Sequence, residues 1–347
     1  MRVVRFYAPE DVRIEDAPEP RPDPGDLVIR VRNCSTCGTD AKIYRSGHPN
    51  LSPPRVLGHE IAGEVVEIGE GVTGWAVGDR VQVIAAIPDG DCYECRRGWM
   101  TVCPNQESIG YQYDGGFAQF MRIPEKVLRV DGVNRIPEGL SFAEASVAEP
   151  LACVLNGQEH ALVGDGDTVV VVGSGPIGCM HVRLARARGA ARVFLIDLSR
   201  ERLEMAASRV QPDEAIGGAD AADTVEAVRK LTDGRGADVI ITAAASGKAQ
   251  EDALKMAAPR GRVSFFGGLP KDRPTITCDS NIVHYREVSI VGANGSSPNH
   301  NKQALELIAS GAVPVADLIT HRLPLEQAIE GIHTVTRGEA IKVTIEA

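Results

Sequence analysis

Residues 169–178 read Val169-Val170-Val171-Val172-Gly173-Ser174-Gly175-Pro176-Ile177-Gly178. The run of valines predicts a buried strand, and the glycines that follow at the spacing G-x-G-x-x-G predict a tight turn into a helix. The first glycine allows the bend, the second lets a pyrophosphate approach the backbone, and the third allows the helix to pack closely on the strand. Proline is tolerated in the first turn of a helix, where its missing N–H costs no hydrogen bond. The stretch therefore predicts a dinucleotide site with phosphates at a helix N-terminus, although a glycine turn can also simply join a strand to a helix.

A second predicted strand ends in Asp197, which stands 197 − 178 = 19 positions beyond Gly178. A carboxylate at this place binds the hydroxyls of the adenosine ribose and repels a 2′-phosphate. Arg202 is a nearby cation that could tolerate such a phosphate. The strand, the glycine turn and the carboxylate together predict a dinucleotide-binding unit and favour NAD over NADP.

Apolar runs alternate with helix-length segments through this part of the chain. The expected strands cover 168–173, 192–197, 237–242, 261–267 and 288–293, and the expected helices cover 176–189, 199–209, 223–233 and 250–258. Continuous Val and Ile runs separated by helices are typical of a parallel sheet covered on both faces. The fold class predicted here is therefore α/β, a doubly wound unit of the Rossmann type.

The first 150 residues have a different pattern of apolar and turn-forming residues. Short β-branched runs at 27–31, 63–68 and 80–84 lie between turns rich in proline and glycine, which predicts an irregular all-β region. After residue 293 we expect a loop, a helix near 301–310 and short strands. A length of 347 residues, at about 150 residues per domain, agrees with two domains.

Composition restricts the partners. The chain has 37 Lys and Arg against 47 Asp and Glu, a net charge of −10, and only 4% aromatic residues, which argues against nucleic acid as the main ligand. No apolar run approaches the about 20 residues of a membrane-spanning helix, and the first residues lack the apolar core of a secretory signal. We therefore expect a cytoplasmic protein that binds neither nucleic acid nor membrane.

Five of the eight cysteines precede residue 104, a crowding that metal binding explains better than disulfides in a reducing compartment. Two segments of this region, Cys37-Gly38-Thr39-Asp40 and Gly58-His59-Glu60, carry side chains that ligate zinc. Three protein ligands and an open position make a catalytic zinc site. Each residue taken alone has a simpler reading, since a buried cysteine usually fills apolar space and a histidine is usually only hydrogen-bonded.

The chain resembles the zinc-dependent medium-chain alcohol dehydrogenases over nearly its whole length. The motifs that carry the resemblance are the two segments above, Val77-Gly78-Asp79-Arg80-Val81, Gly115-Gly116-Phe117-Ala118, Glu149-Pro150-Leu151-Ala152 and the glycine turn. The resemblance implies a GroES-like catalytic domain formed by residues 1–152 and 293–347, with a Rossmann NAD-binding domain, residues 153–292, inserted between them. It also implies a catalytic zinc held by Cys37 and His59, with Glu60 and Glu149 as alternating carboxylate ligands or water-holding groups.

Further roles follow from the same resemblance. Glu149-Pro150-Leu151 is similar to the sorbitol (polyol) and threonine dehydrogenase branch, and Asp197-Leu198-Ser199 with Arg202 is similar to its NAD-dependent members. Arg202 is then expected to stack on or bond the adenosine, and Gly267-Gly268-Leu269 to form the loop that contacts the nicotinamide. The resemblance implies a proton relay at Thr39, which could equally cap the following helix.

Asp40 is a candidate for fixing the imidazole of His59. The second cysteine group, Cys92, Cys95 and Cys103, resembles the structural-zinc lobe of the family. Its missing first cysteine falls at 92 − 3 = 89, where Asp89 stands. Aspartate can ligate zinc, so either a carboxylate and three thiolates bind a structural ion or the site is lost and the thiols are free. We expect the bound zinc, as a part of the fold without a role in the chemistry.

The sequence thus predicts a zinc-dependent enzyme that transfers a hydride from a secondary alcohol of a polyol or sugar derivative to NAD. The sorbitol enzymes have an Arg-Tyr pair where this chain has Ala293-Asn294-Gly295-Ser296-Ser297, so an amino alcohol or a cyclitol also remains open. The alternatives are an enzyme similar to L-threonine 3-dehydrogenase and a non-catalytic NAD-binding sensor or structural protein.

Four residues are candidates for the substrate pocket: Tyr44, His48, Tyr111 and Tyr113. Surface, packing or cross-strand roles fit them equally well. We further expect a homodimer or homotetramer, because the strand at 288–293 can pair with its copy and so remove an exposed sheet edge.

Overall fold

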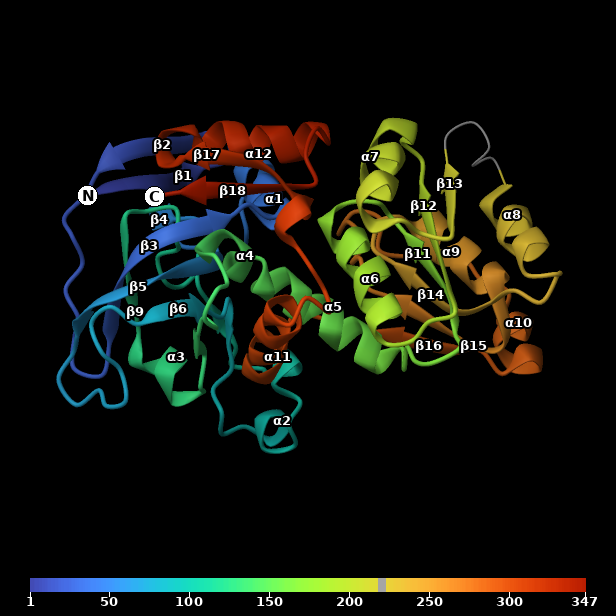
Figure 1. The fold of residues 1–347 in the computed structure, drawn as a ribbon, viewed down its shortest axis with the longest axis horizontal. Coiled ribbons are helices and arrows are strands. Elements are labelled where there is room, and N and C mark those ends of the chain that lie inside the picture. The colour runs from blue at the N-terminus through green and yellow to red at the C-terminus, as the bar shows by residue number, and fades with distance from the viewer. Residues whose placement is uncertain (218–222) are drawn as a thin grey trace. The chain divides into compact units, whose positions relative to one another are not determined.

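The computed structural model describes residues 1–217 and 223–347, which form two compact units (Figure 1). One unit comprises Met1–Ala152 and Gly295–Ala347, and the other comprises Cys153–Asn294. The second unit thus ends 294 − 292 = 2 residues beyond the expected boundary.

The first unit is built on a seven-stranded sheet of order β10-β6-β5-β3-β18-β17, in which β9 also pairs with β3. Its strands are β3 (Leu27–Ser35), β5 (Glu60–Ile68), β6 (Arg80–Val83), β9 (Phe120–Ile123), β10 (Val133–Arg135), β17 (Ile319–Pro324) and β18 (Lys342–Glu346). The last strand of the chain, β18, pairs antiparallel with β3, so that Thr344 lies opposite Ser35. The C-terminal segment is therefore part of the same sheet as the N-terminal strands.

A second sheet of this unit has the order β2-β1-β4, and a hairpin of β7 and β8 closes the base of the loop that carries residues 89–103. These strands are β1 (Arg2–Ala8), β2 (Asp11–Asp16), β4 (Arg55–Val56), β7 (Ala86–Ile87) and β8 (Glu107–Ser108). The helices are α1 (Gly38–Ser46), α2 (Tyr93–Arg96), α3 (Glu125–Arg129), α4 (Phe142–Ser146), α11 (Pro298–Ala309) and α12 (Ala328–Arg337), and α5 (Ala148–His160) continues into the second unit.

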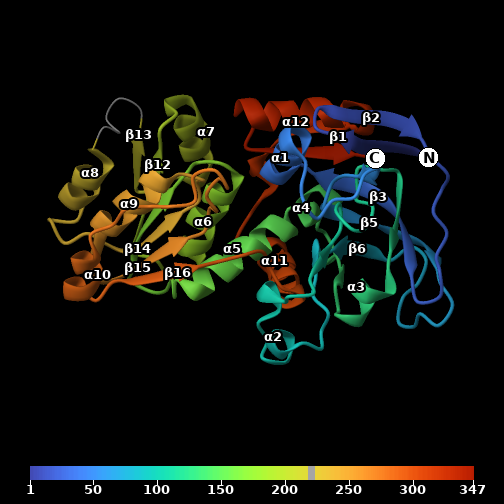
Figure 2. The ribbon, with the colours of Figure 1, turned by 180° about the vertical axis from the view of Figure 1, so that it is seen from behind.

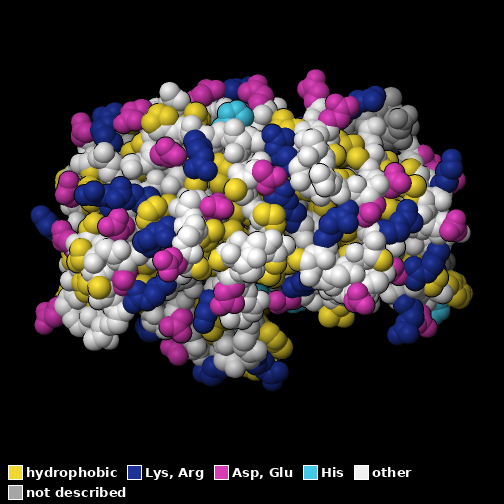
Figure 3. All heavy atoms as spheres, in the orientation of Figure 1, with side chains coloured by type: hydrophobic (Ala, Val, Ile, Leu, Met, Phe, Trp, Pro, Cys, Tyr) yellow, Lys and Arg dark blue, Asp and Glu magenta, His cyan; other side chains and the backbone are white. Residues whose placement is uncertain are grey.

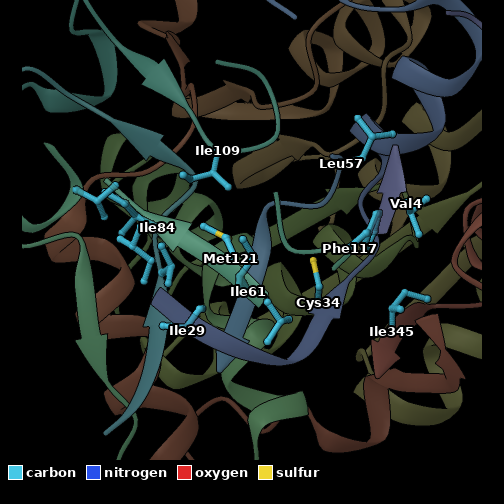
Figure 4. Packing of buried hydrophobic residues seen from close by; sticks show 14 of the residues in the cluster. Val4, Ile29, Cys34, Leu57, Ile61, Ile84, Ile109, Phe117, Met121 and Ile345 are labelled. Atoms are coloured by element: carbon cyan, nitrogen blue, oxygen red, sulfur yellow. The ribbon is translucent and has the colours of Figure 1, made fainter. Parts of the chain in front are cut away.

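The core of the first unit is the cluster shown in Figure 4, in which Ile29, Ile61 and Phe117 are fully buried. Leu27, Ile29 and Val31 alternate along β3 and are all 0% exposed, as expected for one face of a strand that packs on a core. Burial of this face fixes the register of β3 against β5, because a shift of one residue would turn the apolar side chains outward.

The second unit is a six-stranded parallel sheet of order β13-β12-β11-β14-β15-β16, which is the doubly wound arrangement predicted. Helices α6 and α7 lie in front of this sheet in Figure 1, and α9 and α10 lie in front of it in the reverse view of Figure 2. The strands are β11 (Thr168–Val172), β12 (Arg192–Asp197), β13 (Glu214–Gly217), β14 (Ala237–Thr242), β15 (Ala257–Phe265) and β16 (Ser289–Gly292). The helices are α6 (Pro176–Ala187), α7 (Arg200–Val210), α8 (Thr224–Leu231), α9 (Gly247–Met256) and α10 (Ser280–Arg286).

This unit differs from the sequence expectation in several places, among them the start of β15 at residue 257 in place of 261 and the helix α10, which was not predicted. The edge strand β13 was not predicted, because its single buried apolar residue, Ile216, gives no periodic signal. Helix α9 begins at Gly247 and not at residue 250, because the Ser246 side chain accepts the Ala249 N–H and caps the helix there.

No helix among the described residues combines the length and the hydropathy that a bilayer span requires. On the face shown in Figure 3, basic and acidic side chains are interspersed over both units.

Candidate active site

Pairing of β3 with β5 brings the two candidate ligand segments together. Ser35 lies opposite Glu60 in the register, so the residues just beyond each strand, Cys37 and His59, are neighbours. Ligand atoms of Cys37, His59 and Glu60 all lie within 4.8 Å of one another. Cys37 and His59, which stand 59 − 37 = 22 positions apart in the sequence, therefore belong to one cluster, in which His59 and Glu60 are buried.

Asp40 lies next to two of the candidate ligands, Cys37 and His59. Its Oδ2 accepts the backbone N–H of Cys37 at 2.8 Å, and its Oδ1 lies 3.6 Å from Nδ1 of His59. Because Nδ1 faces this carboxylate, Nε2 is the nitrogen that the ring has left for a metal. Burial alone would lower the pKa of His59, but Asp40 and Cys37 raise it well above its usual range. The pocket therefore concentrates negative charge around the imidazole.

Lys342 is a member of the site that the sequence analysis missed. Its ammonium forms an ion pair with Oε2 of Glu60 and donates a hydrogen bond to the carbonyl of Thr36 at 2.8 Å. The Lys342 and Glu60 side chains are 2% and 0% exposed. Burial raises the pKa of Glu60 to about 7, with Lys342 lowering it and Glu149 raising it. The only sequence signal was a lysine inside the apolar run Ile341 to Ile345.

Glu149 lies in the first turn of α5 and is 7% exposed. Its charge raises the pKa of both Glu60 and Lys342, which places it at the same pocket. A buried contact between the hydroxyls of Ser35 and Ser146, 2.6 Å apart, ties the end of β3 to the segment that leads into α5. This contact positions the carboxylate relative to the strand that ends before Cys37.

Thr39 was a candidate both for a proton relay and for the cap of the helix that follows β3. The N-cap of α1 is Cys37, and Asp40 completes a capping box, so Thr39 lies inside the first turn. The reading of Thr39 as the cap is therefore wrong, because the Cys37 backbone has the extended conformation of a cap residue.

The four candidate pocket residues have different surroundings in the structure. Tyr111 packs edge-on against His48, with ring centroids 4.6 Å apart. Burial raises the pKa of Tyr111 to about 12, with a smaller opposing effect of His59, so this ring lies beside the cluster. Tyr113 instead donates a hydrogen bond to Glu107 at 2.9 Å, and Tyr44 packs on His333 at 4.9 Å.

The cluster fits a zinc ion. It offers a thiol, an imidazole nitrogen and buried carboxylates, which are the ligand types that zinc prefers. Two buried carboxylate oxygens, Oδ1 of Asp40 and Oε1 of Glu60, accept no hydrogen bond from the described residues. A divalent cation would neutralise the negative charge that these groups otherwise keep in a dry pocket.

A second cluster contains Asp89, Cys92, Cys95 and Cys103, whose ligand atoms also lie within 4.8 Å of one another. The Cys92 sulfur accepts the Cys95 N–H at 3.4 Å, and the Cys103 sulfur accepts the Asp89 N–H at 3.4 Å. Burial and the adjacent thiols raise the pKa of Cys95 to about 12. A metal ion reverses this tendency, because it binds and stabilises the thiolates. The donor set and its spacing therefore fit a closed zinc site.

Two positions of the glycine turn in the second unit require glycine. Gly173 has φ +111°, and a Cβ on Gly178 would lie 1.8 Å from the Gly173 carbonyl oxygen, so neither position admits a side chain. A Cβ on Gly175 would lie 3.2 Å from a guanidinium nitrogen of Arg202, which places that cation over the turn. The turn follows β11, and Asp197 ends the adjacent strand β12, so both lie at the carboxyl edge of the sheet. This is the edge at which doubly wound sheets bind ligands.

The expected nicotinamide loop follows β15. The Gly267 N–H donates to the Thr242 carbonyl at 2.7 Å, and a Cβ on Gly267 would lie 2.6 Å from the Ala244 carbonyl oxygen. Leu269 is half-buried. Gly267 is thus required for the close approach of this loop to the end of β14.

Comparison with known proteins decides the family. The profile of the alcohol dehydrogenase GroES-like domain matches residues 23–131, and that of the zinc-binding dehydrogenases matches residues 176–310. The chain is 32% identical over 334 residues to a sorbitol dehydrogenase of Halalkalibacterium halodurans, covering 96% of this chain and 94% of the relative. It is 35% identical over 352 residues to an L-threonine 3-dehydrogenase of Pyrococcus horikoshii, covering 98% and 97%.

The chain belongs to the zinc-dependent alcohol dehydrogenase family. Its fold matches the alcohol dehydrogenase TADH of Thermus sp. ATN1 with a TM-score of 0.89 and 31% identity, over 100% of this chain and 99% of that one. It also matches a protein of Sinorhizobium meliloti 1021 that was solved bound to NADP, with a TM-score of 0.90 and 30% identity over 100% and 99%. This dehydrogenase is an enzyme that uses zinc and a nicotinamide dinucleotide, which leaves the non-catalytic alternative without support.

Proposed function

We propose that this dehydrogenase oxidises a secondary alcohol of a polyol or sugar derivative with NAD. The observation that carries the proposal is the cluster of Cys37, His59 and Glu60, with Glu149 at the same pocket. The sorbitol dehydrogenase relative supports the substrate class. The carboxylate of Asp197 at the carboxyl edge of the sheet supports NAD, because it would repel a 2′-phosphate.

Cys37, His59 and Glu149 are the residues that we propose to hold the catalytic zinc. Glu60 is the fourth candidate: its Oε2 is paired with the ammonium of Lys342, and its Oε1 accepts no hydrogen bond from the described residues. A zinc ion at this cluster supplies Lewis acidity, which makes an alcohol easier to deprotonate. The dinucleotide supplies the acceptor for the hydride.

The other side chains of the cluster orient the reacting groups. The carboxylate of Asp40, 3.6 Å from Nδ1 of His59, would favour the tautomer with the proton on Nδ1 and leave Nε2 available as a ligand. The hydroxyl of Thr39, two positions beyond Cys37, is proposed as a proton relay: it would accept the proton that the alcohol loses and pass its own proton on towards solvent. Tyr111 and His48 form an aromatic wall beside the cluster, which excludes water and contacts the carbon chain of the substrate.

The cofactor contacts are proposals of the same kind. Gly173, Gly175 and Gly178, with Pro176 and Ile177 in the first turn of α6, would receive the pyrophosphate at the helix N-terminus. Asp197 and Arg202 would contact the adenosine, and the loop of Gly267 and Leu269 the nicotinamide.

A screen of substrates tests the proposal against its nearest alternative. We expect kcat/KM for at least one of sorbitol, xylitol and galactitol to exceed that for L-threonine by at least about tenfold. L-Threonine has the secondary alcohol that would react but lacks the further hydroxyls of a polyol, and a site that bonds those hydroxyls discriminates strongly against a substrate without them. The measurement is the absorbance of the reduced nicotinamide that forms, with NAD and NADP compared as acceptors in parallel assays. L-Threonine as the preferred substrate would instead support the second candidate, which the 35% identity to an L-threonine 3-dehydrogenase favours.

We also propose a cytoplasmic location and a symmetric dimer, two of which can form a tetramer. The eight cysteines all lie among the described residues and form no disulfide, which agrees with a reducing compartment. Strand β16 is the edge of its sheet, and its Ile290 is 42% exposed. Antiparallel pairing of β16 with its copy would cover that edge, and the mass from light scattering tests it.

The second cluster gives a prediction about zinc content. The purified enzyme is expected to hold about two zinc ions per chain, and Asp89→Ala is expected to hold about one. Loss of the ion from the 89–103 loop should lower Tm by about 4–8 °C, which corresponds to about 2 kcal/mol for a domain of this size. The control is Asp91→Ala, which removes an exposed carboxylate outside the cluster. An unchanged zinc content in Asp89→Ala would show that Asp89 is not a ligand.

A further inference from the structure

Ser174 lies between the first two glycines of the turn and is 2% exposed. Its backbone N–H and its hydroxyl both donate to Oδ2 of Asp197, at 2.8 Å and 2.7 Å. The other carboxylate oxygen, Oδ1, accepts the backbone N–H of Ser199 at 2.9 Å. Three donors therefore fix the orientation of this carboxylate before any cofactor binds.

The Ser174 hydroxyl is the only side-chain donor to Asp197 among the residues that the structure describes. Ser199 contributes its backbone alone, because its own hydroxyl accepts the Arg202 N–H and caps α7. The two backbone donors are set by the turn and by the helix start, and any residue at these positions would supply them. The identity of residue 174 thus decides whether a third bond exists.

This bond bears on the choice between NAD and NADP. Arg202 lies over the turn and could pair with a 2′-phosphate, but only if the carboxylate of Asp197 moved away from that phosphate. Hydrogen bonds to a charged group are stronger than those between neutral groups, so each bond to Asp197 opposes this movement.

We propose that the Ser174 hydroxyl is a specificity-determining positioning group, which holds Asp197 in place and thereby excludes NADP. The proposal rests on the cofactor site of the proposed function. It can be tested without any alcohol substrate, because it concerns only the binding of the dinucleotide. Ser174 acts through Asp197, and no contact of its hydroxyl with the cofactor is invoked.

The test is titration of the purified full-length enzyme with NADH and with NADPH, followed by fluorescence and without any alcohol. For Ser174→Ala we expect the ratio of Kd for NADPH to Kd for NADH to fall about three- to tenfold, which is less than the full effect of losing one hydrogen bond to a charged group because the two backbone bonds to Asp197 remain. Most of the fall should come from weaker NADH binding. The matched control is Ser208→Ala on α7, whose hydroxyl donates to the Met205 carbonyl at 2.9 Å, and it should leave the ratio unchanged.

A double variant tests whether Ser174 acts through Asp197. If Ser174 acts through Asp197, Ser174→Ala should have no further effect on the ratio in a chain that already carries Asp197→Ala, which leaves the hydroxyl no side-chain acceptor at position 197. An unchanged ratio in Ser174→Ala, or the same change in both backgrounds, would overturn the proposal. Ser174→Cys fills nearly the same volume with a weaker donor, so it serves as the test if the alanine variant does not fold. An enzyme that oxidises no polyol would refute the proposed function and still give these titrations.

Discussion

Replacement of Cys37 by alanine is expected to lower kcat/KM for the alcohol by at least about a thousandfold. A catalytic metal contributes several kcal/mol of charge stabilisation, and about 4 kcal/mol corresponds to that factor. The thiol belongs to a cluster in which three ligand atoms lie within 4.8 Å of one another. Without it, only His59 and Glu60 of that cluster would remain as ligands. Zinc content, measured by elemental analysis, should fall by about one ion per chain.

Cys34→Ala is the matched control for this variant. Cys34 lies three positions earlier, on β3, and its side chain is 0% exposed within the apolar core, where it packs beside Phe117 and Ile61 in Figure 4. We expect this variant to keep the full zinc content and nearly the full kcat/KM, with some loss of stability from the cavity. If Cys37→Ala retained its zinc and its activity, the assignment of the cluster as the catalytic centre would be wrong.

The sequence could predict the members of this cluster but not their geometry. Cys37 and His59 follow from the residue types and from the resemblance to a family, and the glycine turn and Asp197 follow from spacing along adjacent strands. The distances depend on the register of β3 against β5, which is set by burial of Ile29 and its neighbours on the core face. Such long-range pairing leaves no local pattern in the sequence.

Two residues that the sequence analysis did not single out make contacts that only the folded chain forms. Lys342 reaches Glu60 across 342 − 60 = 282 positions, because β18 returns to pair with β3. Ser174 was visible as a position inside the glycine motif, but its bond to Asp197 depends on the alignment of β11 with β12. In both cases the partner is a charged group whose role was already predicted, so the missed residues are those that hold predicted ones in place.

Lys342→Met is expected to lower the free energy of unfolding by about 3–5 kcal/mol, because it leaves the buried carboxylate of Glu60 without its cation. Replacing only one partner is costly, whereas removing both charges is often nearly neutral. The double variant Glu60→Gln with Lys342→Met should therefore recover much of the loss.

The measurement is urea denaturation of the zinc-loaded enzyme, followed by circular dichroism, with Lys42→Met as the control. Lys42 is an exposed lysine on α1, so its replacement should change the free energy of unfolding by no more than about 0.5 kcal/mol. A Lys342→Met variant as stable as the Lys42 control would show that Glu60 is neutralised by another group. A double variant no more stable than Lys342→Met would place the cost in lost packing of the lysine side chain, because the charge imbalance at Glu60 would then contribute little.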